Sequence, residues 1–89
     1  MKSDCYYNNC RICGLELSKA PWGKNEDTPS FDICPCCGVE FGYEDITLST
    51  ICNFREQWLI KGAQWFRPKM KPDCWNLKKQ LRQISPKYR

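Results

Sequence analysis

The chain has 89 residues, a formal net charge of +4, eight cysteines and no histidine. This length predicts one domain whose apolar core supplies only roughly 3–5 kcal/mol, so disulfides or a metal are expected to stabilise it. The lack of histidine removes the commonest general base at neutral pH and restricts a transition-metal site to thiolates, with carboxylates as a second ligand type.

Residues 1–9 are predicted to form a loose N-terminal leader. Their sequence, MKSDCYYNN, lacks the apolar core of a secretory signal. No segment of the chain approaches the roughly 18 apolar residues of a membrane helix. We therefore expect a cytoplasmic protein, in which thiols stay reduced and cysteine patterns bind metal more often than they form disulfides.

Two C-x-x-C-G motifs predict a metal site. Cys10 and Cys13 form the first pair, Cys34 and Cys37 form the second, and 20 residues separate the pairs. This spacing is typical of a four-thiolate zinc site, and a glycine after each pair allows the positive φ at which the turn reverses. We predict that the four sulfurs bind Zn²⁺ as a closed, structural site, so the protein is not expected to be an enzyme. A thioredoxin-like redox motif and a disulfide framework are the alternatives.

Four further cysteines lie outside this set. Cys36 stands inside the second motif and is predicted to point away from the metal, while Pro35 stiffens the turn. Cys52 and Cys74 are expected to behave as small buried hydrophobic residues. Cys5 is near enough to Cys10 in sequence to replace a ligand, although we favour the C-x-x-C set.

Short alternating segments around the two motifs predict strands. Residues 15–17 and 31–33 are expected to pair as an antiparallel hairpin across the zinc ion, and residues 39–43 to form a third strand. The predicted fold class is therefore α+β: a small zinc ribbon followed by two C-terminal helices. One domain over residues 1–89 would comprise the leader (1–9), the zinc ribbon (10–47) and a helical extension (48–89).

The helical extension shows an apolar stripe at helical spacing. Its members are Ile51, Phe54, Trp58 and Trp65, with Leu59 and Phe66 beside them. Ser49 or Thr50 is the expected N-cap, and Gly62 either ends or interrupts this helix. The tryptophans are expected to pack in the core.

A second, shorter helix is expected near the C-terminus. Leu77, Leu81 and Ile84 recur at helical spacing, and Asn76 precedes them as a plausible N-cap. The segment RPKMKPD, with two prolines, would connect the two helices.

The charge is distributed unequally along the chain. Residues 1–53 carry a net charge of −4, and residues 54–89 carry +8. The basic half could bind an acidic protein or phosphates, or it could face water or complement the acidic half within the molecule. The candidate partner-binding residues are Arg55, Lys61, Arg67, Lys69, Lys71, Lys78, Lys79 and Arg82. The sequence pI of about 8.6 is lower than that of dedicated nucleic-acid binders.

Three blocks of the sequence resemble a known group of proteins. ICPCCGVEFGYED, FREQWLIKGAQWF and CWNLKKQL are similar, in this order, to small bacterial cysteine-rich (CPCC-type) proteins of uncharacterised function with a zinc-ribbon-like start. The recurring positions of that group map onto Arg55, Trp58, Gly62, Trp65, Trp75, Asn76, Gln80 and Leu81. The chain departs from the group at Leu77, where proline is expected, and adds Cys52 and Cys74. Similar cysteine-rich proteins occur near bacterial toxin systems, in which small acidic or mixed proteins act as immunity partners, so the resemblance suggests an immunity role.

The sequence thus favours a non-catalytic, zinc-stabilised module that binds another protein, with neutralisation of a toxin as one form of this function. Nucleic-acid binding through the basic helices is the alternative. A thiol redox protein that uses Cys36 and its neighbours is a second alternative.

Overall fold

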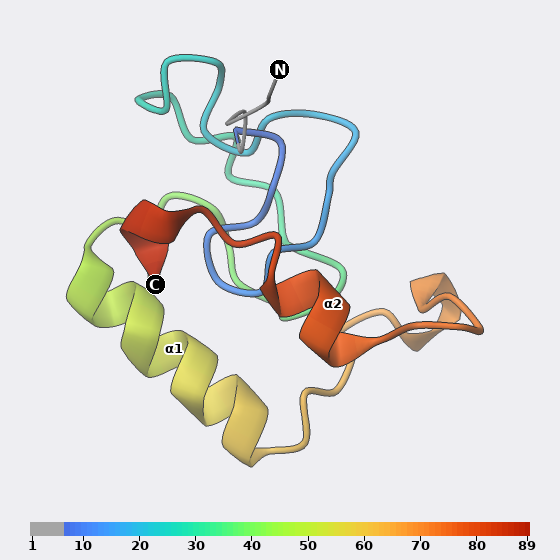
Figure 1. Cartoon of the computed structure of the whole chain (residues 1–89). Helices are drawn as coiled ribbons and strands as arrows, with labels where there is room; N and C mark the ends of the chain where they lie inside the picture. Colours follow the sequence, from blue (N-terminus) through green and yellow to red (C-terminus); the bar gives the residue numbers. More distant parts are fainter. Residues whose placement is uncertain (1–6) are drawn as a thin grey trace.

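A computed structural model describes residues 7–89 of the chain. Loops and turns make up residues 7–47, and four helical elements follow (Figure 1). These elements are α1 (Leu48–Ile60), the 3₁₀ helix η1 (Pro68–Met70), α2 (Leu77–Leu81) and the 3₁₀ helix η2 (Pro86–Tyr88). None of the helices within residues 7–89 is long and apolar enough to cross a membrane.

The predicted zinc ribbon is wrong for the described part of the chain. In place of paired strands, residues 7–89 contain two isolated antiparallel bridges, Asn9 with Glu16 and Ile33 with Glu40. Each bridge closes one cysteine motif on itself, so residues 15–17 pair with the chain just before Cys10 rather than with residues 31–33. The local closure satisfies the backbone groups next to each turn, which leaves no ladder between the two motifs. We call residues 8–17 the first cysteine loop and residues 32–41 the second cysteine loop.

Helix α1 begins at a threonine N-cap. The backbone N–H of Thr50 donates to Thr47 Oγ1 at 3.2 Å, which satisfies one free donor of the first turn. The expected cap at Ser49 or Thr50 is therefore wrong by two or three residues. Both Ser49 and Thr50 lie inside the helix, and Thr50 Oγ1 donates to the Thr47 carbonyl instead.

Gly62 ends α1 rather than interrupting it. Its φ of 100° lies in the region that favours glycine, and its N–H donates to the Leu59 carbonyl at 3.0 Å. The N–H of Ala63 donates to the Trp58 carbonyl at 2.8 Å. These two bonds form a Schellman motif, which turns the chain back toward the cysteine loops.

Helix α2 is short and has the expected N-cap. Asn76 Oδ1 accepts a hydrogen bond of 2.9 Å from the Lys79 N–H, which confirms the prediction. Leu77 and Leu81 are half-buried, and Ile84, just after the helix, is buried. The second apolar stripe therefore faces inward even though only five residues are helical.

The core lies between the two cysteine loops and the helices. Sulfur atoms and aromatic rings make up much of it, and Trp58 and Trp65 are buried in it as expected. From α1, Ile51 and Trp58 are buried and Phe54 is half-buried, whereas Leu59 is exposed. The buried cluster comprises Cys10, Ile12, Cys13, Cys34, Cys36, Cys37, Val39, Phe41, Ile51, Trp58, Ala63 and Trp65.

Candidate metal centre

The two cysteine loops have the same backbone structure, displaced by 24 residues in sequence. In the first, the Gly14 N–H donates to the Cys10 carbonyl at 3.0 Å; in the second, the Gly38 N–H donates to the Cys34 carbonyl at 3.0 Å. The φ angles of these glycines are 84° and 83°. A side chain at either position would be strained, which explains the glycine in each motif. A second hydrogen bond also repeats: the backbone N–H groups of Cys10 and Cys34 each donate to the carbonyl of the residue five positions later.

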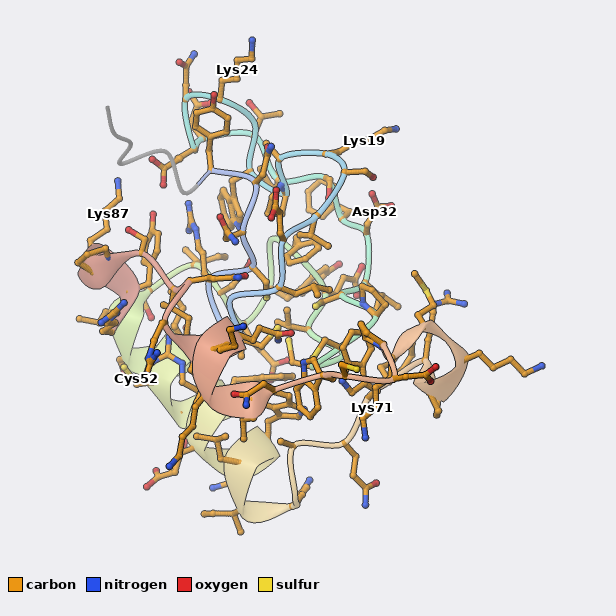
Figure 2. The ribbon with its side chains drawn as sticks, turned by 45° about the vertical axis from the view of Figure 1, so that its right-hand side comes forward. Lys19, Lys24, Asp32, Cys52, Lys71 and Lys87 are labelled. Atoms are coloured by element: carbon orange, nitrogen blue, oxygen red, sulfur yellow. The ribbon has the colours of Figure 1, made fainter. Side chains whose placement is uncertain are left out.

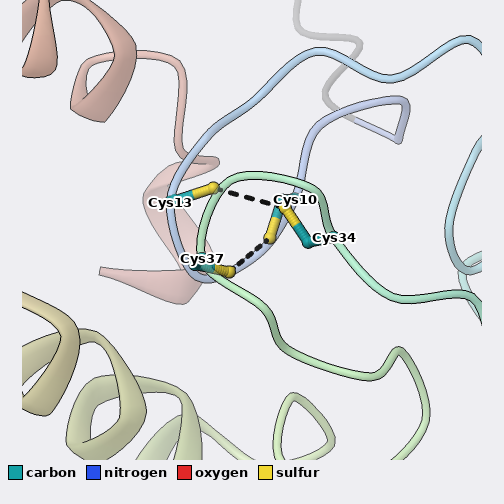
Figure 3. A group of neighbouring side chains, drawn as sticks. All are labelled: Cys10, Cys13, Cys34 and Cys37. Carbon is teal, nitrogen blue, oxygen red and sulfur yellow. Dashed lines mark hydrogen bonds between the residues drawn. The ribbon is translucent and has the colours of Figure 1, made fainter. Parts of the chain in front are cut away.

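The loops bring the four predicted sulfurs together. Sγ of Cys10 lies 3.7 Å from Sγ of Cys37, and Sγ of Cys13 lies 3.7 Å from Sγ of Cys34. All four sulfurs lie within 4.8 Å of one another, and all four residues are buried (Figure 3). Each close pair joins one loop to the other, so the cluster is the point at which the two loops meet.

These separations fit a tetrahedral metal ion. Four sulfurs at about 2.3 Å from a central zinc ion would lie about 3.8 Å apart. The measured 3.7 Å for two of the pairs agrees with this geometry. The four cysteines could therefore hold one metal ion. A tetrahedral set of four thiolates suits zinc or iron better than magnesium or calcium, which prefer oxygen ligands.

The thiols of the cluster shift one another's pKa values in opposite directions. Hydrogen bonds from Cys10 and Cys13 hold the pKa of Cys34 far below its ordinary value. Burial raises the pKa of Cys13 and of Cys37. Without a cation, the neighbouring thiols would stabilise the charge on Cys34 while burial keeps Cys13 and Cys37 protonated. A divalent cation would allow all four sulfurs to lose their protons.

Groups from the C-terminal half donate hydrogen bonds to backbone carbonyls of both loops. Arg55, on α1, donates from Nε to the Ile12 carbonyl at 2.7 Å and from Nη2 to the Arg11 carbonyl at 2.9 Å. At the equivalent positions of the second loop, the backbone N–H groups of residues 66 and 67 donate to the carbonyls of residues 36 and 35, both at 2.9 Å. The Arg55 guanidinium thus donates two hydrogen bonds to the first loop, and two backbone N–H groups donate the equivalent hydrogen bonds to the second loop.

Helix α2 packs directly on the first loop through Gln80. Gln80 Nε2 donates to the Cys13 carbonyl at 3.1 Å and to Cys36 Sγ at 3.3 Å, and Gln80 Oε1 accepts from Trp75 Nε1 at 2.7 Å. A Cβ atom at Gly14 would lie 2.3 Å from the Gln80 carbonyl oxygen. Gly14 therefore serves both the turn and the close approach of α2.

Cys36 does not belong to the four-sulfur group, in agreement with its predicted orientation. The 24-residue repeat places it at the position of Ile12, and both residues are fully buried. Its sulfur accepts a hydrogen bond from Gln80 Nε2. A hydrogen bond with Cys13 lowers the pKa of Cys36 despite its burial.

The remaining cysteines differ from expectation in part. Cys74 is exposed, so the predicted burial is wrong for it; the chain around it is an open connector rather than a helix. Cys52 is half-buried and donates from Sγ to the Arg89 carbonyl at 3.5 Å. Cys5 lies outside the described residues.

Two buried charged residues were missed by sequence reasoning. The guanidinium of Arg11 lies between the rings of Trp22 and Tyr88, at 4.0 and 4.5 Å from their centroids, and donates to the Asp45 carbonyl at 2.9 Å. The carboxylate of Asp45 accepts from Trp22 Nε1 and from the Gly42 N–H, each at 2.7 Å. Nothing in the sequence spacing marks these residues, because Arg11 is 34 residues from Asp45 and Trp22 is 23 residues from Asp45.

Of the predicted partner-binding residues, Arg55 is half-buried and engaged with the first loop. The other seven are exposed: Lys61, Arg67, Lys69, Lys71, Lys78, Lys79 and Arg82. The salt bridge found within residues 7–89, between Lys87 and Glu26, involves none of them. Among residues 7–89, therefore, the two halves of opposite charge are not joined by ion pairs from these seven residues.

Comparisons with known proteins give relatives but no function. No protein-family model and no solved structure matches the chain. The chain is 38% identical over 88 residues to the uncharacterized protein YoaQ of Bacillus subtilis, covering 82% of this chain and 73% of the relative. It is 31% identical over 98 residues to the uncharacterized protein YozI of the same organism, covering 85% of this chain and 81% of the relative. The chain therefore belongs to the family that includes YoaQ and YozI.

Proposed function

We propose that this protein is a non-catalytic interaction module organised by one structural zinc ion, with Cys10, Cys13, Cys34 and Cys37 as the ligands. The observation that carries the proposal is the 3.7 Å separation of two sulfur pairs, one sulfur of each pair coming from each loop. Four thiolates fill a tetrahedral coordination shell, so no position is free for water or substrate. The ion then has a structural role and joins the two loops.

Cobalt substitution tests the coordination directly. Protein refolded with Co²⁺ should show the intense visible bands of a tetrahedral tetrathiolate complex, and Zn²⁺ should displace the cobalt and abolish them. Elemental analysis of protein purified from zinc- and iron-containing medium then identifies the native ion. Iron in place of zinc, or octahedral cobalt spectra, would contradict the proposal.

The interaction role rests on the charge of the surface. The seven exposed basic residues follow the sequence from the end of α1 through η1 to α2, and Figure 2 labels one of them, Lys71, whose side chain projects from this region. We infer a protein partner with an acidic surface, because such a partner complements this charge. A toxin neutralised by this protein is one such partner.

Charge reversal tests the interaction. A protein captured from the native host by the wild type should be lost with the double variant Lys78→Glu/Lys79→Glu, since both side chains are exposed on α2. Glu56→Lys, at an exposed position of α1, is the matched control and should retain it. Tight, salt-sensitive binding of oligonucleotides by the wild type, with no such protein captured, would favour the nucleic-acid alternative and contradict the proposal.

A further inference from the structure

The four cysteines of the candidate metal centre are not equally buried. Cys10, Cys13 and Cys34 are fully buried, whereas Cys37 retains 8% of its surface exposed. Cys37 also lines a surface pocket of about 230 Å³ between α1 and the turn that follows it. We call this pocket the port, and its lining residues are Cys37, Phe54, Gln57, Trp58, Lys61 and Gln64.

The port has the size and chemistry to admit a small polar reagent. A water molecule occupies about 30 Å³, so the port accommodates a molecule the size of hydrogen peroxide without rearrangement. Lys61 contributes a positive charge, and Gln57 and Gln64 are exposed amides at its rim. Reactive cysteines occur in partly exposed, electropositive surroundings of this kind.

From this asymmetry we propose that Cys37 is the oxidation site of the cluster, reached by hydrogen peroxide through the port, and that Cys10 completes the reaction by forming a disulfide with it. The proposal rests on the proposed metal-binding function and gives that site a redox control. The partner of Cys37 is assigned by distance, because Sγ of Cys10 lies 3.7 Å away.

The chemistry balances in two steps. The Cys37 sulfur attacks one oxygen of the peroxide, an S–O bond forms, the O–O bond breaks, and hydroxide leaves. The Cys10 sulfur then attacks the Cys37 sulfenic sulfur, an S–S bond forms, the S–O bond breaks, and a second hydroxide leaves. Two thiolates lose two electrons, and the peroxide gains them and yields two waters after protonation. Only Cys13 and Cys34 then remain as ligands, which is too few to retain the ion.

Peptide mapping locates the first site of reaction. The variant Cys5→Ser/Cys52→Ser/Cys74→Ser removes the thiols outside the buried cluster, and its metal content is measured before oxidation. Brief treatment with hydrogen peroxide and the sulfenic-acid trap dimedone should label Cys37 first. Without the trap, a Cys10–Cys37 disulfide should appear in step with metal release, measured with a colorimetric chelator.

A matched pair of variants tests the port. Gln64→Phe should fill the port and slow metal release several-fold, and it preserves the hydrogen bond of the Gln64 carbonyl with Trp58 Nε1. Gln83→Phe places the same side chain at an exposed position away from the port and should leave the rate unchanged.

The outcomes separate this inference from the proposed function. Protein that contains no metal before oxidation would contradict the proposed function itself. Metal-loaded protein in which Cys13, Cys34 or Cys36 is labelled before Cys37 would overturn the oxidation site. Equal rates for Gln64→Phe and Gln83→Phe would overturn the port.

Discussion

The buried cysteines fall into two classes according to what each sulfur contacts. The cluster sulfurs lie within 4.8 Å of one another, whereas Cys36 takes the position that Ile12 occupies in the first loop and contacts Gln80. The cluster members are expected to be needed for the metal, and Cys36 to be needed only for packing. A cysteine-to-serine substitution, which replaces only the sulfur atom by oxygen, distinguishes these two roles.

Cys34→Ser should abolish stoichiometric metal binding and unfold the protein, because an alcohol is a poor zinc ligand and a structural zinc ion contributes on the order of 10 kcal/mol. Cys36→Ser should retain the metal and lower the free energy of unfolding by only about 1–2 kcal/mol, since a hydroxyl can still accept from Gln80. Elemental analysis and urea unfolding measure both effects. Equal metal loss in the two variants would place Cys36 among the ligands.

Arg55→Lys tests the other residue on which the first loop depends. A lysine keeps the charge but cannot donate to the carbonyls of residues 11 and 12 in the fork geometry of a guanidinium. We expect the free energy of unfolding to fall by about 2–4 kcal/mol, because partly buried carbonyls lose charge-assisted hydrogen bonds. Arg82→Lys, at an exposed position, is the control. A loss no larger than that of the control would show that charge alone suffices at position 55.

At the scale of elements, the contact between α2 and the first loop requires a position without a side chain. Gly14 and Gly23 both have positive φ angles, of 84° and 74°, but their surroundings differ. A Cβ at Gly14 would lie 2.3 Å from the Gln80 carbonyl oxygen, whereas a Cβ at Gly23 would come no closer than 3.7 Å to its neighbours. Substitutions at these two glycines therefore distinguish the cost of backbone strain from the cost of a steric clash with α2.

Both Gly14→Ala and Gly23→Ala should lose about 1–2 kcal/mol of stability through strain at positive φ. Gly14→Ala should lose about 1–3 kcal/mol more, because α2 must move away from the loop. Thermal or urea unfolding of the two variants gives the difference. Equal destabilisation would mean that α2 adjusts freely and that its packing on the loop is weak.

The docking of η2 depends on pH through Glu26. Burial acts to raise the pKa of Glu26, but hydrogen bonds from Lys87 and Tyr88 outweigh it and lower the pKa below its usual value. Lys87 Nζ lies 3.1 Å from Glu26 Oε2, and Tyr88 Oη donates to Glu26 Oε1 at 3.0 Å. Because the folded-state pKa is the lower one, this contribution is present above the unfolded-state pKa and lost as the pH falls through the folded-state value.

Wild-type protein should therefore be more stable than Glu26→Gln at neutral pH, and the difference should shrink as the pH falls below about 4.5. The stability of both proteins also depends on pH through the cysteines, and this shared dependence cancels when the two free energies of unfolding are subtracted. Urea unfolding across this pH range measures it, and a difference that stays constant with pH would contradict the assignment. Glu44→Gln, at an exposed position, serves as the control.

For the whole molecule, sequence reasoning was most successful where structure is determined locally. The cysteine spacing and the glycine after each pair predict the two loops, and the Asn76 cap and the stripe through Ile51 and Trp58 follow from local periodicity. These features depend on residues a few positions apart, so a single sequence contains the information.

Long-range pairing could not be predicted in the same way. Residues 15–17 and 31–33 alternate like strands, but each segment closes its own cysteine loop, and alternation does not specify the partner of a strand. The role of Arg55 was missed because a guanidinium replaces two backbone donors there, a substitution that no periodicity marks. Arginine is usually an exposed residue, so the sequence does not indicate that Arg11 is buried. Its burial depends on the rings of Trp22 and Tyr88, which are distant along the chain.

The most direct test is to measure the zinc bound to protein purified under reducing conditions, together with its circular dichroism before and after chelation. A single zinc ion per chain, and loss of the folded signal when a strong chelator removes it, are the results predicted here. Metal-free protein that retains the same signal and the same unfolding midpoint would contradict the claim that an ion joins the two cysteine loops.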